Sequence, residues 1–582
     1  MDRETDSWFS PASPPPAWDP TQNQYRAKEP APYQFAAAPV AEQPYLYEPE
    51  QPYPYEPEQA YEAEQPYEPE QPYEPEQEYE AEPATEKAAY EIPETPETGW
   101  SGAPSRRRRW IGRILLAGVL LIQGLLSLRL GNTAATDEAI SLIVGHQEFD
   151  HLFNGTAVTT DLVQQFPGSP SLYPVLAAAA DAAYGLAGAR LLSLLFALVG
   201  TALLYSLTRR MFNERVAICS AGAYAVLQST AVVGYYAAPD ALAIMLVAIA
   251  AWIIVYSNRA PAAVVLAAAP AAALAVAVEH ASVLVLPTLL LLAVLTAWPL
   301  PTRGLLRGFL LGAATLALLF ATGVLSGVRN GTFARGRGTE SALSILSTAG
   351  QWSGLLLLLA FGGAVAYLWR ERMNEVVDAA VVASSPLRRA ALGLVLCGTG
   401  LLLPLLQAQL HTSAVMFRHI GLGLFFAAPL AGVGISRMMG AHFRQPQLGI
   451  LAWVLMLALG ISQSTLRFGA WPDSTRLVSV LRTHVSAKGH YLTEVEGVPQ
   501  YYLRGVTGPD RWTSLRDQSA SATVSAIEKG RYDLILLDGA SSTDKDKAAT
   551  KAIRASGHYR LIAQLPYRVS GGSGAYRVYV AQ

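Results

Sequence analysis

Cysteine is scarce in this chain, with only Cys219 and Cys397 among 582 residues. Both fall in apolar segments, which argues against a disulfide framework or a cysteine-ligated metal site. The first hundred residues are polar and rich in proline, so the sequence also lacks a cleavable signal peptide. The formal net charge of −3 averages an acidic N-terminal part against basic loops, and we expect no nucleic-acid partner.

Residues 1–105 contain little aliphatic surface. Tyr61, Tyr67, Tyr73 and Tyr79 recur every six residues, in units such as Tyr-Glu-Pro-Glu-Gln-Pro. Such a segment buries too little apolar surface to offset the entropy of ordering, and its prolines favour extended conformations. We therefore predict a disordered acidic tail in the cytoplasm. It serves either as a solvated spacer or as a docking segment for a cytoplasmic partner.

The remainder of the chain is rich in long apolar runs. Hydrophobic residues make up 51% of the sequence, and the mean hydropathy is +0.23 in spite of the polar first hundred residues. The middle must therefore be more apolar than a soluble core, which predicts an all-α polytopic membrane protein. The apolar stretches lie near 111–130, 188–207, 216–235, 241–257, 261–278, 281–298, 305–325, 352–369, 391–408, 420–436 and 447–465.

The basic loops predict the orientation of these stretches. Arg106 to Arg109 precede the first stretch and should stay in the cytoplasm. A further stretch, 171–187, is short and alanine-rich and carries Asp181. If it crossed the membrane, the basic loop 208–215 would face outside; if it lies along the surface, this loop and the later basic loops face the cytoplasm. We therefore predict about eleven spans, with 171–187 juxtamembrane or re-entrant and the C-terminus outside.

The last segment has the pattern of a small α/β domain. Residues 532–538 are typical of a buried strand that ends in an acid, and 576–580 alternate like a strand with one solvated face. The sequence thus predicts a tail (1–105), a transmembrane domain (106–466) and an extracytoplasmic α/β domain (467–582).

Under this topology, acids and bases gather on the outer face. The residues concerned are Asp137, Glu138, Asp240, Glu279, His280, Arg329, Arg335, Arg337, His411, Arg418 and His419. A carboxylate can take the proton of an attacking hydroxyl, and arginines and histidines can neutralise a leaving phosphate. Asp137 and Glu138 closely follow the first span, at the edge of the bilayer, so the pattern indicates chemistry on a lipid-linked substrate.

Several motifs of this region resemble the GT-C glycosyltransferases. Ser127-Leu128-Arg129-Leu130-Gly131-Asn132 is followed by Asp137-Glu138-Ala139, as in the first outer loop of that superfamily. The segment 189–194 leads into a span with a basic end, and 235–242 resembles the second acidic loop. The similarity covers about 110–260 and is greatest to the protein O-mannosyltransferase and aminoarabinose transferase group.

The resemblance implies an inverting transfer of a sugar from a polyprenyl-phosphate donor to a hydroxyl of a protein, lipid or glycan acceptor on the outer face. It makes Asp137 the general base, with Glu138 and Asp240 completing the catalytic set. No cofactor is required, and membrane lipids surround the site. We expect the donor phosphate to be bound by Arg329, Arg335, Arg337, His411, Arg418 and His419, with Glu279 and His280 as further cavity residues.

Each of these groups also has a simpler explanation. The acidic pair could start a solvated helix after Thr136, a good N-cap, and Asp240 could stabilise a helix dipole. The cations within 411–419 could anchor to lipid headgroups, and the arginines within 329–337 could belong to a flexible Gly-Arg loop.

Other functions are weighed against this one. His146, Glu148, Asp150 and His151 are metal-ligand types, but their spacing fits no strong site, so a divalent metal is not indicated. A transporter or flippase for lipid-linked sugars is the main alternative. It should show internal repeats and broken helices with polar residues at the midplane, and the sequence contains no convincing repeat. A third alternative is an inactive scaffold that binds wall polymer.

Overall fold

The computed structural model describes residues 106–156, 158, 168–297, 301–328, 338–369, 385–440, 445–539 and 543–582. All of these residues belong to one compact unit, Tyr90–Gln582. The predicted disordered tail lies outside the described residues, as do the predicted phosphate ligands Arg329, Arg335 and Arg337.

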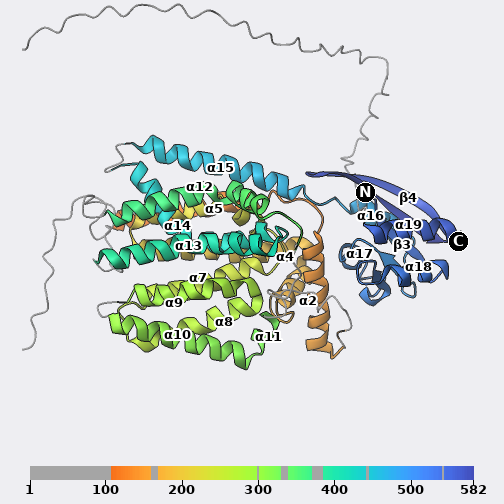
Figure 1. Cartoon of the computed structure of the whole chain (residues 1–582), viewed down its shortest axis with the longest axis horizontal. Coiled ribbons are helices and arrows are strands. Elements are labelled where there is room, and N and C mark those ends of the chain that lie inside the picture. The colour runs from red at the N-terminus through yellow and green to blue at the C-terminus, as the bar shows by residue number, and fades with distance from the viewer. Residues whose placement is uncertain are drawn as a thin grey trace, which may run out of the picture. The chain divides into compact units, whose positions relative to one another are not determined.

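The first part of the described chain is helical (Figure 1). Its α-helices are α1 (Arg106–Ser127), α2 (Thr136–Asn154), α4 (Tyr173–Met211), α5 (Glu214–Ala225), α6 (Gln228–Val233), α7 (Asp240–Tyr256), α8 (Ala269–Val278), α9 (Leu286–Leu295), α10 (Pro301–Ala321), α11 (Val324–Val328), α12 (Ala342–Leu368), α13 (Pro386–Leu410), α14 (Met416–Met438) and α15 (Pro446–Phe468). The 3-10 helices η2 (Ala262–Ala268) and η3 (His280–Val285) lead into α8 and α9. Most of the long helices run side by side, whereas α2 runs crosswise to them (Figure 1).

Seven helices of the described residues are long and apolar enough to cross a membrane, namely α1, α4, α10, α12, α13, α14 and α15. Three shorter apolar helices cover Asp240–Tyr256, Ala262–Val278 and His280–Leu295. These helices confirm the predicted multi-pass membrane protein. The count of about eleven spans, the orientation of the chain and the three domain boundaries stay predictions.

The ambiguous stretch 171–187 forms the beginning of α4, a helix of 39 residues. Tyr184 and Gly185 have non-helical backbone angles inside it, and the φ of Gly185 is +64°. This conformation suits glycine, which has no Cβ to clash with the backbone. The kink therefore separates the stretch that carries Asp181 from the apolar segment 188–207, which follows within the same helix.

The stretch 216–235, which the sequence predicts as one span, is instead divided between α5 and α6. Leu227 has an extended backbone, with φ −64° and ψ 145°, and it interrupts the helix between them. The polar sequence Gln228-Ser229-Thr230 follows and is buried. An extended residue breaks the helical hydrogen-bond ladder, so the apolar pattern alone overstated the continuity of this helix.

Helix α14 occupies the centre of the helical part, as its burial shows: 94% of its most apolar stretch is buried inside the protein. Small residues let its neighbours approach closely. A Cβ on Gly434 would lie 2.3 Å from the carbonyl oxygen of Leu359 in α12, and one on Gly363 would lie 1.9 Å from that of Leu430. Such backbone-to-backbone packing by small residues is typical of helix pairs in membranes.

The C-terminal part is an α/β structure with a five-stranded sheet in the order β2-β1-β3-β5-β4. Its elements are α16 (Thr475–Arg482), β1 (Tyr491–Thr493), α17 (Val498–Tyr502), β2 (Trp512–Ser514), α18 (Ala520–Glu528), β3 (Leu534–Asp538), α19 (Asp544–Ser556), β4 (Tyr559–Val569) and β5 (Gly572–Ala581). β1 is parallel to β2 and β3, whereas β5 is antiparallel to β3 and β4. The two strands predicted from the sequence are confirmed as β3 and β5.

The close contact between α12 and α14 predicts that one added methyl group at Gly434 lowers the stability of the protein. Gly434→Ala should destabilise the protein by about 1–3 kcal/mol, because its Cβ cannot fit against the Leu359 carbonyl without moving a helix. The matched control is Gly354→Ala in α12, where no atom lies within 4 Å of the added Cβ. Thermal unfolding of the purified protein in detergent measures both. An equal midpoint for the two variants would contradict the close contact.

Candidate functional site

Four elements of the helical part bring the candidate residues together. Asp137 lies in the first turn of α2, and Asp240 is the first residue of α7. Glu279 precedes η3, and Arg418 and His419 lie in the first turn of α14. Residues far apart in the sequence therefore meet where several helices begin or end.

Arg418 joins the two aspartates of the site. Its Nη1 lies 3.1 Å from Oδ2 of Asp137, and its Nε lies 3.7 Å from Oδ2 of Asp240. The arginine side chain is 5% exposed, whereas that of Asp137 is 48% exposed. A buried guanidinium needs counter-charges, and the two carboxylates supply them from different helices. The predicted phosphate ligand thus also organises the acids.

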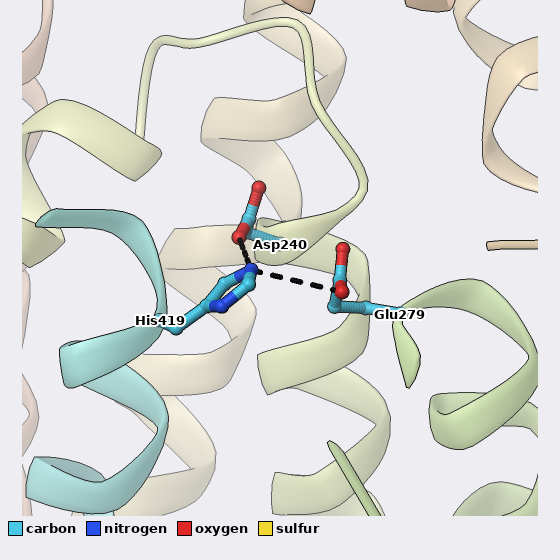
Figure 2. Close-up of side chains that lie close together, drawn as sticks. All are labelled: Asp240, Glu279 and His419. Carbon is cyan, nitrogen blue, oxygen red and sulfur yellow. Dashed lines mark ion pairs between the residues drawn. The ribbon is translucent and has the colours of Figure 1, made fainter. Parts of the chain in front are cut away.

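Asp240, Glu279 and His419 form a buried cluster (Figure 2). The His419 Nε2 lies 3.5 Å from Oδ1 of Asp240 and 3.6 Å from Oε1 of Glu279. Both carboxylates are only 4% exposed. In Figure 2 the imidazole points between the two acids, of which Asp240 begins α7 and Glu279 lies between α8 and η3.

This cluster has the donor types of a divalent-metal site. Its three ligand atoms lie within 4.8 Å of one another, and carboxylate oxygen and imidazole nitrogen suit zinc or manganese. A protonated His419 would satisfy the same two acids without an ion. The sequence spacing did not reveal this set, because its members lie far apart along the chain. Of the predicted metal-ligand types within 146–151, His146 pairs instead with Asp181.

Glu138 has a different environment from Asp137. Its Oε1 accepts hydrogen bonds from Nε of Arg190 at 2.8 Å and from the backbone N–H of Ala237 at 2.8 Å. Its Oε2 accepts from Nη2 of Arg190 at 2.7 Å and from the backbone N–H of Ala135 at 3.0 Å. The side chain is 0% exposed. This geometry favours a positioning role for Glu138, and its predicted catalytic role is untested.

The start of α2 also differs from the simpler explanation of the acidic pair, in which Thr136 is the N-cap of a solvated helix. Thr136 is the first helical residue, and Ala135 takes the N-cap position. The Glu138 carboxylate provides the cap by accepting the Ala135 N–H. The acidic pair therefore does begin a helix, but one of its members is buried and ion-paired. A solvated helix start does not describe Glu138.

The remaining predicted residues lie around this centre in different ways. His280 is buried in η3. His411 ends α13 with a left-handed backbone, φ 54°, and its Nδ1 lies 2.9 Å from the carbonyl oxygen of Glu340. His411 thus tethers one loop to another. Arg467 is a further cation near the site that the sequence patterns did not indicate. Its guanidinium lies 3.4 Å from the centroid of the ring of Phe417, the residue that precedes Arg418.

Comparisons with known proteins agree with this fold. The family model for dolichyl-phosphate-mannose-protein mannosyltransferase matches residues 182–326. No curated protein matches the sequence. The structure of ArnT from Cupriavidus metallidurans in the apo state is similar with a TM-score of 0.52 at 14% identity, over 82% of this chain and 98% of that one.

Two other solved structures are similar to the same degree. ArnT from Cupriavidus metallidurans bound to undecaprenyl phosphate has a TM-score of 0.52 at 13% identity, over 81% of this chain and 98% of that one. The oligosaccharyltransferase of Archaeoglobus fulgidus in the apo form has a TM-score of 0.52 at 12% identity, over 81% and 75%. At these identities the likeness concerns the fold. Together with the family match over residues 182–326, it confirms the resemblance to the GT-C superfamily that the motifs predicted.

Burial of the Glu138–Arg190 ion pair predicts that the loss of either charge lowers the stability of the protein. Glu138→Gln should destabilise the protein by about 3–5 kcal/mol, because the substitution leaves Arg190 buried without its counter-charge. Asp137→Asn, next to it in the same helix, should change stability much less, because Asp137 is half exposed. Thermal unfolding in detergent compares the two. Equal stability would show that the buried pair does not hold this region.

Proposed function

We propose that this protein is a glycosyltransferase that moves a sugar from a polyprenyl-phosphate donor to a hydroxyl of a protein, lipid or glycan acceptor on the outer face of the membrane. The observation that carries the proposal is the contrast between neighbouring acids. Asp137 is 48% exposed, whereas Glu138 is fully buried, and Asp240 and Glu279 are 4% exposed. Of these four acids, Asp137 alone is open to an acceptor hydroxyl.

Asp137 acts as the general base of an inverting displacement. The acceptor oxygen attacks the anomeric carbon while its proton passes to the Asp137 carboxylate. The bond between that carbon and the phosphate oxygen breaks, and polyprenyl phosphate leaves. Arg418, 3.1 Å from Asp137, holds this carboxylate beside the cations that would face the leaving phosphate.

The leaving phosphate is neutralised by cations near the acids. Arg418 and His419 line the buried side of the site, and Arg467 adds a third charge. Glu279 and His280 shape the same cavity. A divalent ion held by Asp240, Glu279 and His419 would supply positive charge to the same oxygen atoms. We further assign to donor binding His411 and the arginines Arg329, Arg335 and Arg337.

The donor class and the orientation belong to the same proposal. One similar structure, that of ArnT, is bound to undecaprenyl phosphate, which supports a polyprenyl-phosphate donor here. Basic loops in the cytoplasm place the start of α2 and the α/β part outside. The tail (1–105), the transmembrane domain (106–466) and the extracytoplasmic domain (467–582) are the proposed divisions.

Asp137→Asn tests the base. A positioned carboxylate contributes about a hundred- to ten-thousand-fold to such a transfer, so the variant should lose most activity while it still binds donor. Membranes that contain each variant are incubated with radiolabelled undecaprenyl-phosphate sugars, and label in macromolecular product is counted. The matched control is Asp150→Asn, an exposed acid on the same helix, which should transfer normally.

Two outcomes would overturn this assignment. Near-normal transfer by Asp137→Asn, with an inactive Asp240→Asn, would move the base to Asp240. Donor that crosses the membrane without any transfer in the wild type would favour a transporter of lipid-linked sugars. Analysis of wall glycans and glycoproteins in a deletion strain identifies the acceptor class independently.

His419→Gln tests the phosphate side more cleanly than a substitution of Arg418. Removing Arg418 would leave the buried Asp240 without its arginine, whereas Gln can replace the hydrogen-bonding shape of His419. The variant should raise the donor KM about tenfold, since a charge-assisted contact to phosphate is worth about 1.5 kcal/mol or more. The acceptor KM should stay unchanged. A selective change in acceptor KM would place His419 on the acceptor side.

A further inference from the structure

Helix α17 of the α/β part packs into the core of the helical part. Val498 and Tyr501 are 4% and 7% exposed and belong to the same hydrophobic cluster as Leu142 and Ile143 of α2. Gly497 precedes α17 with φ +75°, and a Cβ there would lie 3.0 Å from Ile140. The backbone of the α/β part therefore lies directly against α2, the helix that carries Asp137.

A buried polar cluster joins the same elements. Asp181 of α4 has a fully buried side chain. Its Oδ1 accepts a hydrogen bond from the Tyr501 hydroxyl at 2.5 Å, and its Oδ2 lies 2.6 Å from Nη1 of Arg504 and 2.7 Å from Nε2 of His146 in α2. One carboxylate thus links α2, α4 and the segment that includes α17. Burial, followed by the bond to Asp181, raises the pKa of Tyr501, so its hydroxyl stays protonated and donates.

The loop that leads into α2 is held from the same side. The Tyr502 hydroxyl accepts a hydrogen bond from the backbone N–H of Ala134 at 2.8 Å. The Trp471 indole donates to the carbonyl of Thr133 at 2.8 Å, and the Ser474 N–H donates to the Thr133 hydroxyl at 2.9 Å. Ala134 lies three residues before Asp137 and just before the N-cap of α2, so a displacement of this loop would shift the first turn of α2.

We propose that Tyr501, Tyr502 and Arg504 are positioning residues of the active site, through which the C-terminal α/β part holds the first turn of α2 in its reactive place. The effect of these three residues on catalysis rests on the proposed function, in which Asp137 is the base. None of the three residues needs to touch substrate. Their effect passes through Ala134 and Asp181 to the Asp137 carboxylate, where a displacement of about 1 Å can cost about a hundredfold in rate.

The proposal predicts a specific kinetic signature. Tyr502→Phe removes the acceptor of the Ala134 N–H but keeps the ring, and Arg504→Gln removes the charge beside Asp181. Both should lower kcat about ten- to a hundredfold and change the donor KM by less than about twofold, because the donor-phosphate cations are untouched. Arg504→Lys, which keeps the charge, should recover part of the loss. The control is Tyr532→Phe, whose hydroxyl donates to Gln518 within the α/β part.

A second measurement does not depend on activity. Hydrogen–deuterium exchange of the full-length protein, followed by mass spectrometry, should show faster exchange over residues 134–142 in Tyr502→Phe and Arg504→Gln than in Tyr532→Phe. Unchanged exchange in both variants, or a raised donor KM with normal kcat, would overturn the proposal. Faster exchange in the two variants, combined with a wild type that transfers no sugar, would support the positioning contacts and refute the proposed function instead.

Discussion

The site depends on one buried carboxylate that is not expected to react. Glu138 pairs with Arg190 from α4, accepts the N–H of Ala135 before α2, and accepts the N–H of Ala237 before α7. The first contact anchors the helix of Asp137, and the last anchors the loop that leads to Asp240. Breaking such a buried ion pair costs about 3–5 kcal/mol, so the relative position of the two aspartates is strongly determined.

Around this anchor, the structure divides four acids by their access to water. Glu138 is saturated by donors, Asp240 and Glu279 face His419 in the interior, and Asp137 reaches the surface beside Arg418. A general base must meet its substrate, and of these four acids the half-exposed Asp137 meets this requirement best. Burial and partners therefore distinguish chemically similar carboxylates. Glu138 holds neighbouring segments together, Asp240 and Glu279 add negative charge in the interior, and Asp137 is the proposed base.

The sequence predicted much of the architecture, because membrane spans and buried strands leave strong local patterns. Apolar length identified the helical membrane protein, a buried apolar run that ends in an acid identified β3, and period-two alternation identified β5. The acidic and basic motifs within 110–260 indicated the resemblance to the GT-C superfamily, which the family match supports. Local pattern failed at 216–235, where one extended residue, Leu227, divides an apolar run into α5 and α6. Hydropathy does not report such a break, since both pieces stay buried.

For the candidate site, the sequence by itself determined which acids and cations are available and that the pair Asp137-Glu138 lies just after the first span. Only the tertiary structure decided their partners and their burial. It paired Glu138 with Arg190, placed Arg418 between two acids, assembled Asp240, Glu279 and His419, and brought Tyr501 to Asp181. The physical reason is that ion pairs and burial depend on which helix ends meet in space, and separations of tens to hundreds of residues leave no local pattern in the sequence.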